Sequence, residues 1–307
     1  MIVSWAVRPL QIIRTIRWPM LVLLGWDFLV VIGEMVMHWS WVSWPSIPLA
    51  LYGAAIGLLL SFRNASTYNR WWEARTLWGA IVNKSRTFAR QVLNTMSAGE
   101  GSTAEQREEV AAVQRRLVMY QVAYVHALRL QLRKLDPLAE VARLLPDEET
   151  RTLTGETNAA LALQKRMGEI VIAAQRKGWL DQWQWQAIDR SLDSLMDAQG
   201  GVERIKNTPM PRQYDFLARL FVLVYCVILP VGIVESLRWF TPLGSTIVGF
   251  MFMALDKIGR DLENPFDNNI HDVPMTAIAT TIEINLRQLL GETELPMAVK
   301  PVDGVLW

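Results

Sequence analysis

Residues 46–75 read SIPLALYGAAIGLLLSFRNASTYNRWWEAR, and this stretch decides the fold. Its first part, residues 46–62, carries no charged side chain and is about as long as the roughly 20 residues that a membrane-spanning helix requires. From Arg63 on it passes directly into a sequence rich in Arg, Asn, Ser and Thr. The stretch therefore predicts a membrane-spanning helix that continues into a polar helix.

One face of this predicted helix has a regular pattern. Ala54, Leu58 and Phe62 recur every four residues and form a stripe, and Gly53 and Gly57 lie on another face. Such a helix could line a water-filled path that has an apolar constriction. The alternative is an ordinary apolar helix that continues into the cytosol, and the pattern alone favours this alternative.

Composition indicates a membrane protein with a large water-soluble part. Of the 307 residues, 51% are hydrophobic and the mean hydropathy is +0.16, whereas charged residues still make up 20%. The net charge of +1 gives no bulk attraction for nucleic acid. A single cysteine, Cys226, excludes an internal disulfide framework and a cysteine-based zinc site.

Four apolar stretches predict four transmembrane helices, in pairs at the two ends of an all-α chain. They are residues 20–38, 46–62, 216–237 and 239–255. The first stretch also fits a secretory signal peptide, but no small-residue cleavage site follows it, and a second apolar stretch comes directly after.

Helical periodicity between the pairs predicts a large cytosolic helical bundle. Residues 115–135 and 180–196 are predicted amphipathic helices, the first with Arg115, Arg116, Arg129 and Arg133 off its apolar face. Loops are expected at 98–103 and 147–155. Residues 274–291 predict a last amphipathic helix. The expected parts of the chain are 1–63 with two transmembrane helices, 64–213 as the cytosolic helical region, 214–258 with two further transmembrane helices, and 259–307 as a cytosolic segment.

Basic residues orient the predicted helices. They occur in the first segment, in the middle region and in the tail, whereas the loop at 39–46 has none. The positive-inside rule therefore places both termini and the bundle in the cytoplasm. Asp27 and Glu34 lie seven residues apart on one face of the first span. Intramembrane acids are costly, so they either pair within the protein, for example with Arg63, or line an aqueous path.

No motif of an enzyme or a metal site is present. Residues 99–104 match a loose GxGxxA pattern, but the preceding sequence predicts a helix rather than a strand, so a loop is expected. His38, His126 and His271 lack metal-ligand spacing, and His126 is expected in a core. We expect no catalytic residues, no metal and no cofactor, and hence no enzyme.

Three motifs resemble those of the bestrophin channels, and most closely the bacterial members. They are the RWW-type sequence within residues 62–75, the sequence ERIxxTPxP at 203–211, and LENPF at 262–266. The motif residues singled out are Arg70, Trp71, Trp72, Asn264, Pro265 and Phe266. The likeness covers nearly the whole chain with the same order of spans.

This resemblance implies a homopentamer around one central pore, in a bacterial inner membrane. Ala54, Leu58 and Phe62 match the family's neck, where the first position is usually bulkier. A second constriction falls at Gln186, where the family often has an aliphatic residue. Arg63 and Asn64 are candidate pore or vestibule residues.

The resemblance implies passage of small monovalent ions, with anions such as chloride favoured. A cation-selective channel and a non-conducting membrane scaffold remain alternatives. Arg63 below the neck would favour anions, whereas Asp27 and Glu34 would favour cations if they face water. The implied partners are the bilayer, the permeant ions and copies of the same chain. Animal bestrophins carry a run of acidic residues that binds calcium, directly after the position that corresponds to Phe266 of this chain. Here only Asp267 and Asp272 remain in residues 267–272, so such a calcium site is not expected.

Overall fold

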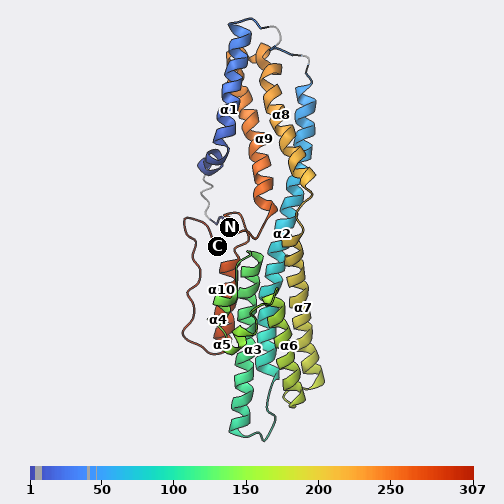
Figure 1. The fold of residues 1–307 in the computed structure, drawn as a ribbon, viewed down its shortest axis with the longest axis vertical. Helices are drawn as coiled ribbons and strands as arrows, with labels where there is room; N and C mark the ends of the chain where they lie inside the picture. Colours follow the sequence, from blue (N-terminus) through green and yellow to red (C-terminus); the bar gives the residue numbers. More distant parts are fainter. Residues whose placement is uncertain (4–8, 40–41, 46) are drawn as a thin grey trace. The chain divides into compact units, whose positions relative to one another are not determined.

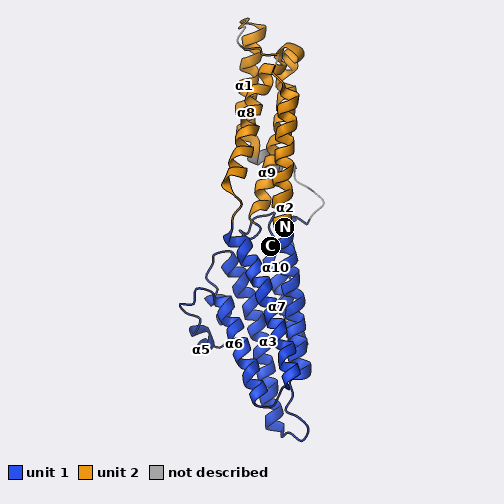
Figure 2. Ribbon diagram, turned by 90° about the vertical axis from the view of Figure 1, so that its right-hand side faces the viewer, with its two compact units in different colours: residues 1–3, 72–208, 265–307 blue, residues 4–71, 209–264 orange. Residues whose placement is uncertain are grey.

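The computed structural model describes residues 1–3, 9–39, 42–45 and 47–307. The regular elements of these residues are helices, accompanied by isolated β-bridges (Figure 1). The chain forms two compact units, which keep the names given in Figure 2. Unit 1 contains residues 1–3, 72–208 and 265–307, and unit 2 contains residues 4–71 and 209–264. The helical content agrees with the predicted all-α class.

Unit 2 is a bundle of long apolar helices. It contains α1 (Pro9–Met35), the first part of α2 (Leu49–Thr95), α8 (Arg212–Leu237), the short 3-10 helix η1 (Arg238–Phe240) and α9 (Thr241–Glu263). Helices α8 and α9 are side by side, and α1 packs against both (Figure 1). The chain reverses between α8 and α9 at Arg238, whose φ of 46° lies in the left-handed region.

Small residues let the helices of unit 2 approach closely. A Cβ atom on Gly53 of α2 would lie 2.9 Å from the hydroxyl oxygen of Tyr225 on α8. A Cβ on Gly249 of α9 would lie 3.6 Å from Cys226 Sγ. The buried core around these contacts includes Leu60 and Leu229.

Unit 1 is a helical bundle with a central helix. It consists of the rest of α2 together with α3 (Ala104–Leu132), α4 (Leu138–Ala142), α5 (Asp147–Arg151), α6 (Ala159–Arg176), α7 (Gln182–Asn207) and α10 (Met275–Leu289). Between Leu117 and Arg129 every residue of α3 except Met119 is buried. Helices α6, α7 and α10 all pack on α3.

The position of α3 corrects one expectation. The helix was expected to be amphipathic, with Arg129 on a polar face, but Arg129 is only 9% exposed. A helix that is packed on all sides has no face left for water. The guanidinium of Arg129 therefore has to find its partners inside the protein.

The element boundaries follow local sequence signals. Helix α2 runs without interruption through Arg63, which confirms the predicted continuous helix. The loop at 98–103 is also confirmed. The expected loop at 147–155 is wrong for Asp147–Arg151, which form α5, because three acidic residues in the first turn stabilise the positive end of the helix dipole.

Three helical stretches among the described residues are long and apolar enough to cross a membrane. They are Ile16–Met35, Leu49–Thr95 and Arg212–Glu263, and the last of them contains both α8 and α9. The chain is therefore a membrane protein with long apolar helices.

Candidate functional site

The predicted stripe of α2 lies at the surface of the protomer. Leu58 is 59% exposed and Phe62 is 64% exposed, and Ala54 is exposed as well. We call these three residues the α2 stripe. Helix α2 thus presents two large apolar side chains, one helical turn apart, on the surface of the protomer.

The opposite face of this part of α2 packs against the other helices of unit 2. Its buried residues are Ile56, Leu60, Arg63 and Thr67. At 100° per residue the mean direction of these four side chains is about 170° away from that of the α2 stripe. The stripe therefore points away from the other helices of unit 2.

Arg63 is buried among carboxylates. Its Nη1 lies 2.6 Å from Asp256 Oδ1 on α9, and its Nη2 pairs with Asp215 on α8. Asp256 also pairs with Arg260 at 2.9 Å. A buried guanidinium requires such partners, because an uncompensated charge in an apolar bundle is costly. Arg63 was expected to present its charge to a pore. In the protomer its guanidinium instead forms ion pairs that link α2 to α8 and α9.

Asn64 follows the same pattern. Its Nδ2 donates to the carbonyl oxygen of Leu255 on α9 at 3.0 Å. Gly259 of α9 lies so close that an added Cβ would collide with the Asn64 amide. The half-buried Asn64 therefore contributes to helix packing.

The two acids of α1 differ in their surroundings. Asp27 is fully buried and accepts a hydrogen bond from Ser245 Oγ of α9 at 2.9 Å, whereas Glu34 is half-buried. Asp27 thus has a hydroxyl partner rather than Arg63, and it does not face water in the protomer. The partner of Asp27 is thus a hydroxyl group of α9, and the expected pairing with Arg63 is not formed.

Gln186 lies in unit 1, on the first turns of α7, and is half-buried. Helix α7 begins with a capping box, in which Asp181 accepts from the backbone N–H of Gln184 at 2.7 Å. Exposed Trp183 precedes Gln186 by one turn.

The RWW-type residues join α2 to its surroundings. Arg70 Nε donates to the carbonyl oxygen of Glu263, at the end of α9, at 2.9 Å. The ring of Trp71 stacks on Tyr68 with 6.4 Å between centroids, and Trp72 is exposed. Arg70 therefore satisfies a carbonyl that the end of α9 leaves without a helical partner.

The Asn-Pro-Phe sequence ends α9 and begins a folded loop. Asn264 is the C-cap residue of α9, and Pro265 and Phe266 are both buried. Within unit 1 the carbonyl of Pro265 accepts from the backbone N–H of Val273 at 3.0 Å. Pro265 and Phe266 are thus part of the buried structure of unit 1.

The two acids after Phe266 have separate partners. Asp267 pairs with Lys206, and buried Asp272 accepts from the backbone N–H of Asn269 at 3.0 Å. Burial raises the pKa of Asp272 to about 6. No group of three or more acidic, His or Cys side chains with metal-binding geometry occurs among the residues that the structure describes.

The sequence did not reveal a buried ion cluster in unit 1. His126, expected in a core, is buried, and its Nε2 lies 2.9 Å from Glu283 Oε2. Arg143 donates to both oxygens of Glu283, at 3.0 and 2.9 Å. Burial alone would raise the pKa of Glu283, but the hydrogen bonds from His126 and Arg143 outweigh it and lower the pKa to about 2. The available signal was a lone Glu inside the apolar pattern of residues 274–291.

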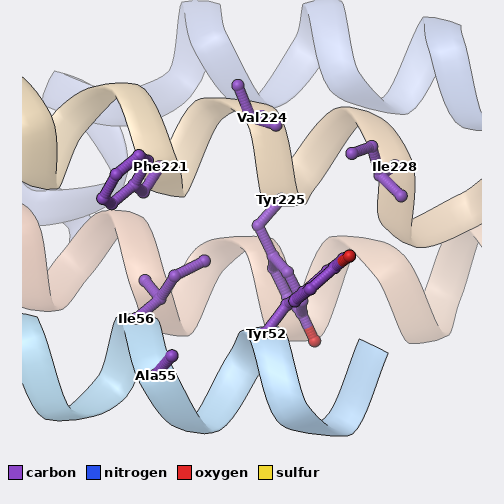
Figure 3. A pocket seen from close by; sticks show the side chains of 7 residues that line it. All are labelled: Tyr52, Ala55, Ile56, Phe221, Val224, Tyr225 and Ile228. Atoms are coloured by element: carbon purple, nitrogen blue, oxygen red, sulfur yellow. The ribbon is translucent and has the colours of Figure 1, made fainter. Parts of the chain in front are cut away.

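An apolar pocket of about 240 Å³ lies between α2 and α8 (Figure 3). Tyr52, Ala55 and Ile56 line it from α2, and the α8 side chains include Phe221 and Tyr225. None of its lining residues is charged, and the polar atoms of its lining side chains are the hydroxyl groups of Tyr52 and Tyr225.

Comparison with known proteins gives consistent matches over most of the chain. A family model described as "Bacterial/Fungal Bestrophin protein" matches residues 4–288. A voltage-dependent anion channel-forming protein of Ralstonia nicotianae is 36% identical over 273 residues, which cover 87% of this chain and 86% of that protein. A protein of the same description from Escherichia coli (strain K12) is 33% identical over 255 residues, with 83% and 80% covered.

Solved structures agree with the sequence relatives. The crystal structure of a bacterial bestrophin homolog from Klebsiella pneumoniae matches with a TM-score of 0.84 and 30% identity, covering 91% of this chain and 100% of that one. These matches are to channel-forming proteins and confirm that the chain is not an enzyme. The resemblance inferred from the RWW-type and Asn-Pro-Phe motifs is also confirmed, and the chain belongs to the bacterial and fungal branch of the bestrophin family.

Proposed function

We propose that this protein is a homopentameric channel for small monovalent anions such as chloride, with a neck lined by the α2 stripe. The observation that carries the proposal is the position of the stripe. Leu58 and Phe62 are exposed on the face of α2 that lies about 170° from its packed face. An apolar surface of this kind on a membrane helix faces lipid, another protomer or a pore.

Oligomerisation is required for a pore. One chain supplies one stripe, and a single helix cannot enclose a path for ions. Cyclic symmetry brings the same face of each protomer to a common axis. The number five rests on the family resemblance.

The neck would act through dehydration. Rings of Leu58 and Phe62 in a narrow pore resist wetting, because water there forgoes hydrogen bonds and ions lose part of their hydration shell. Ala54 would leave its ring wide. In the same proposal Gln186 of α7 forms a polar second constriction.

Anion preference is supported by the relatives, whose descriptions are those of anion channel-forming proteins. Two of the three charges expected to bias the neck contribute little, because Arg63 is paired with two carboxylates and Asp27 is buried against Ser245. The apolar side chains of the proposed neck also carry no charge that could distinguish anions from cations. Selectivity therefore depends on dehydration energies and on charges elsewhere in the assembly.

We propose four membrane-spanning helices in a bacterial inner membrane, with both termini and the helical region 64–213 in the cytoplasm. The close packing of α8 against α9 and the reversal at η1 support two separate spans within residues 212–263. The proposed parts of the chain remain 1–63, 64–213, 214–258 and 259–307.

Reversal potentials of the purified protein in planar bilayers test this function. Under a KCl gradient the expected reversal potential moves toward the chloride equilibrium potential. A shift toward the potassium potential would indicate a cation channel, and a complete lack of current from folded protein would indicate a scaffold. Either result would overturn the proposal.

A further inference from the structure

We propose that Asp27 of α1 is a proton-binding site inside unit 2, and that its neutral carboxylic acid links α1 to α9. The site is separate from the α2 stripe, and its argument does not depend on ion conduction. It rests on a buried carboxyl group that has hydroxyl neighbours but no charged partner among the described residues.

Asp27 lies deep in the apolar part of unit 2. It is near the middle of the predicted span 20–38, and it is 0% exposed. Helices α8 and α9 both pack against α1. The thiol of Cys226 on α8 is close enough to interact electrostatically with the Asp27 carboxyl group. The surroundings of Asp27 are therefore the interior of a helix bundle rather than water.

Charged side chains are distant along the helices around Asp27. The residues of α2 in this bundle up to Phe62 carry no charge. On the other elements, the closest charged residues in the sequence lie seven or more positions from Asp27, Cys226 or Ser245, and they are Arg17, Glu34, Arg219, Glu235, Arg238 and Asp256. Seven residues of an α-helix extend about 10 Å along its axis. No neighbouring cation of the described bundle therefore compensates a negative charge on Asp27.

The hydrogen-bonding groups around Asp27 suit a neutral acid. Ser245 Oγ donates to Asp27 Oδ1 at 2.9 Å. Asp27 Oδ2 and Thr246 Oγ1 are both buried without a hydrogen-bond partner, and the Thr246 hydroxyl is near enough to act on the carboxyl group. An ionised carboxylate is only an acceptor, whereas a protonated one also has an O–H group to donate. A proton on Oδ2 can be donated to Thr246 Oγ1, so that both unpaired atoms gain a partner.

The balance of energies favours the protonated form. In water at pH 7 an ordinary Asp carries a proton in roughly one molecule in a thousand. An isolated carboxylate in an apolar interior is disfavoured by far more than this factor, so that such groups take up a proton instead. The ionised form could accept from both hydroxyls, but two neutral donors do not compensate a full negative charge. A proton also requires no cavity beside the buried oxygen atoms.

Infrared spectroscopy tests for the proton directly. The full-length protein, labelled with carboxyl-13C aspartate and placed in lipid vesicles at pH 7, should show the C=O stretching band of a protonated carboxylic acid in the difference between wild type and Asp27→Asn. Glu34→Gln is the matched control and should keep this band, because Glu34 is a half-buried acid of the same helix. Thr246→Val, which lacks the proposed acceptor, should move the band to a higher frequency. Ionised-carboxylate bands alone in this difference, or an unshifted band in Thr246→Val, would overturn the proposal.

Thermal unfolding over a pH series gives a second test. When the folded protein holds a proton that the unfolded chain releases, stability falls as the pH rises. Between pH 5 and pH 7 the Tm of the wild type should therefore fall by roughly 4–8 °C relative to that of Asp27→Asn, whose side chain does not titrate. Glu34→Gln should keep the pH dependence of the wild type. A constant difference between the wild type and Asp27→Asn over this range would refute the proton site.

Discussion

Truncating the side chains of the α2 stripe distinguishes between two interpretations of this surface, a pore neck and an ordinary packed face. The change is the double substitution Leu58→Ala and Phe62→Ala, with Leu60→Ala as the matched control on the same helix. Leu58 and Phe62 are 59% and 64% exposed, whereas Leu60 is 1% exposed. The three positions therefore differ in burial but share one helix and one kind of chemistry.

The expected costs in stability follow from this burial. Full truncation of a buried Leu costs about 2–5 kcal/mol, and this range applies to Leu60→Ala. For Leu58→Ala less than half of the side chain is buried in the protomer, so the loss is roughly 1–2 kcal/mol, and Phe62→Ala is similar. The two losses together are roughly 2–4 kcal/mol, so the double variant should yield folded protein about as readily as Leu60→Ala.

Conductance in planar bilayers is the decisive readout. Removing both apolar rings widens the neck and lowers the dehydration barrier, so a several-fold rise in conductance or open time is expected. The reversal potential should change little, because no charge is altered. Wild-type conductance in a well-folded double variant would refute the reasoning, as would an equal rise in Leu60→Ala.

Further predictions concern unit 1 and topology. Since the pKa of Glu283 is lowered to about 2 from an unfolded value near 4.5, its stabilisation is present above pH 4.5 and disappears as the pH falls through 2. Glu283→Gln should therefore weaken hydrogen-exchange protection of α10 at pH 7 by about 3 kcal/mol, with the difference vanishing near pH 2. The pH dependence of the stabilisation by Asp272 has the opposite sign. Its pKa is raised to about 6, so its contribution is present below pH 4 and is lost as the pH rises through 6. Asp272→Asn should abolish that loss, and an unchanged pH dependence would count against its burial. Single cysteines at Ser43 and Gly99, in a background without Cys226, should label from opposite sides of the membrane. Labelling of both from one side would contradict the four-span topology.

Much of the fold could be predicted because helices impose simple periods on a sequence. The continuous α2 was visible in the change from an apolar to an Arg/Asn/Ser/Thr sequence without a helix breaker at Arg63. The α2 stripe was likewise visible as a four-residue repeat, and Leu58 and Phe62 of this repeat are exposed in the protomer. Periodicity reports which residues share a face of a helix.

Partners in three dimensions could not be predicted in this way. Arg63 directly follows Phe62 of the proposed neck, but Asp215 and Asp256, which pair with its charge, are 152 and 193 residues away along the chain. Arg129 was expected on a polar face because the sequence does not show that α3 is surrounded by other helices. Asp27 and Ser245 are separated by 218 residues. Long-range pairs of this kind depend on helix packing, which periodicity does not specify.

Thiol modification during current recording tests the central claim most directly. Phe62→Cys and Leu60→Cys would be compared in a Cys226→Ala background, with a water-soluble methanethiosulfonate reagent added while the channels conduct. We predict that Phe62→Cys loses most of its current on modification, because five bulky adducts occlude the neck, and that Leu60→Cys is unaffected. Current block in Leu60→Cys with none in Phe62→Cys would show that the stripe does not line the pore.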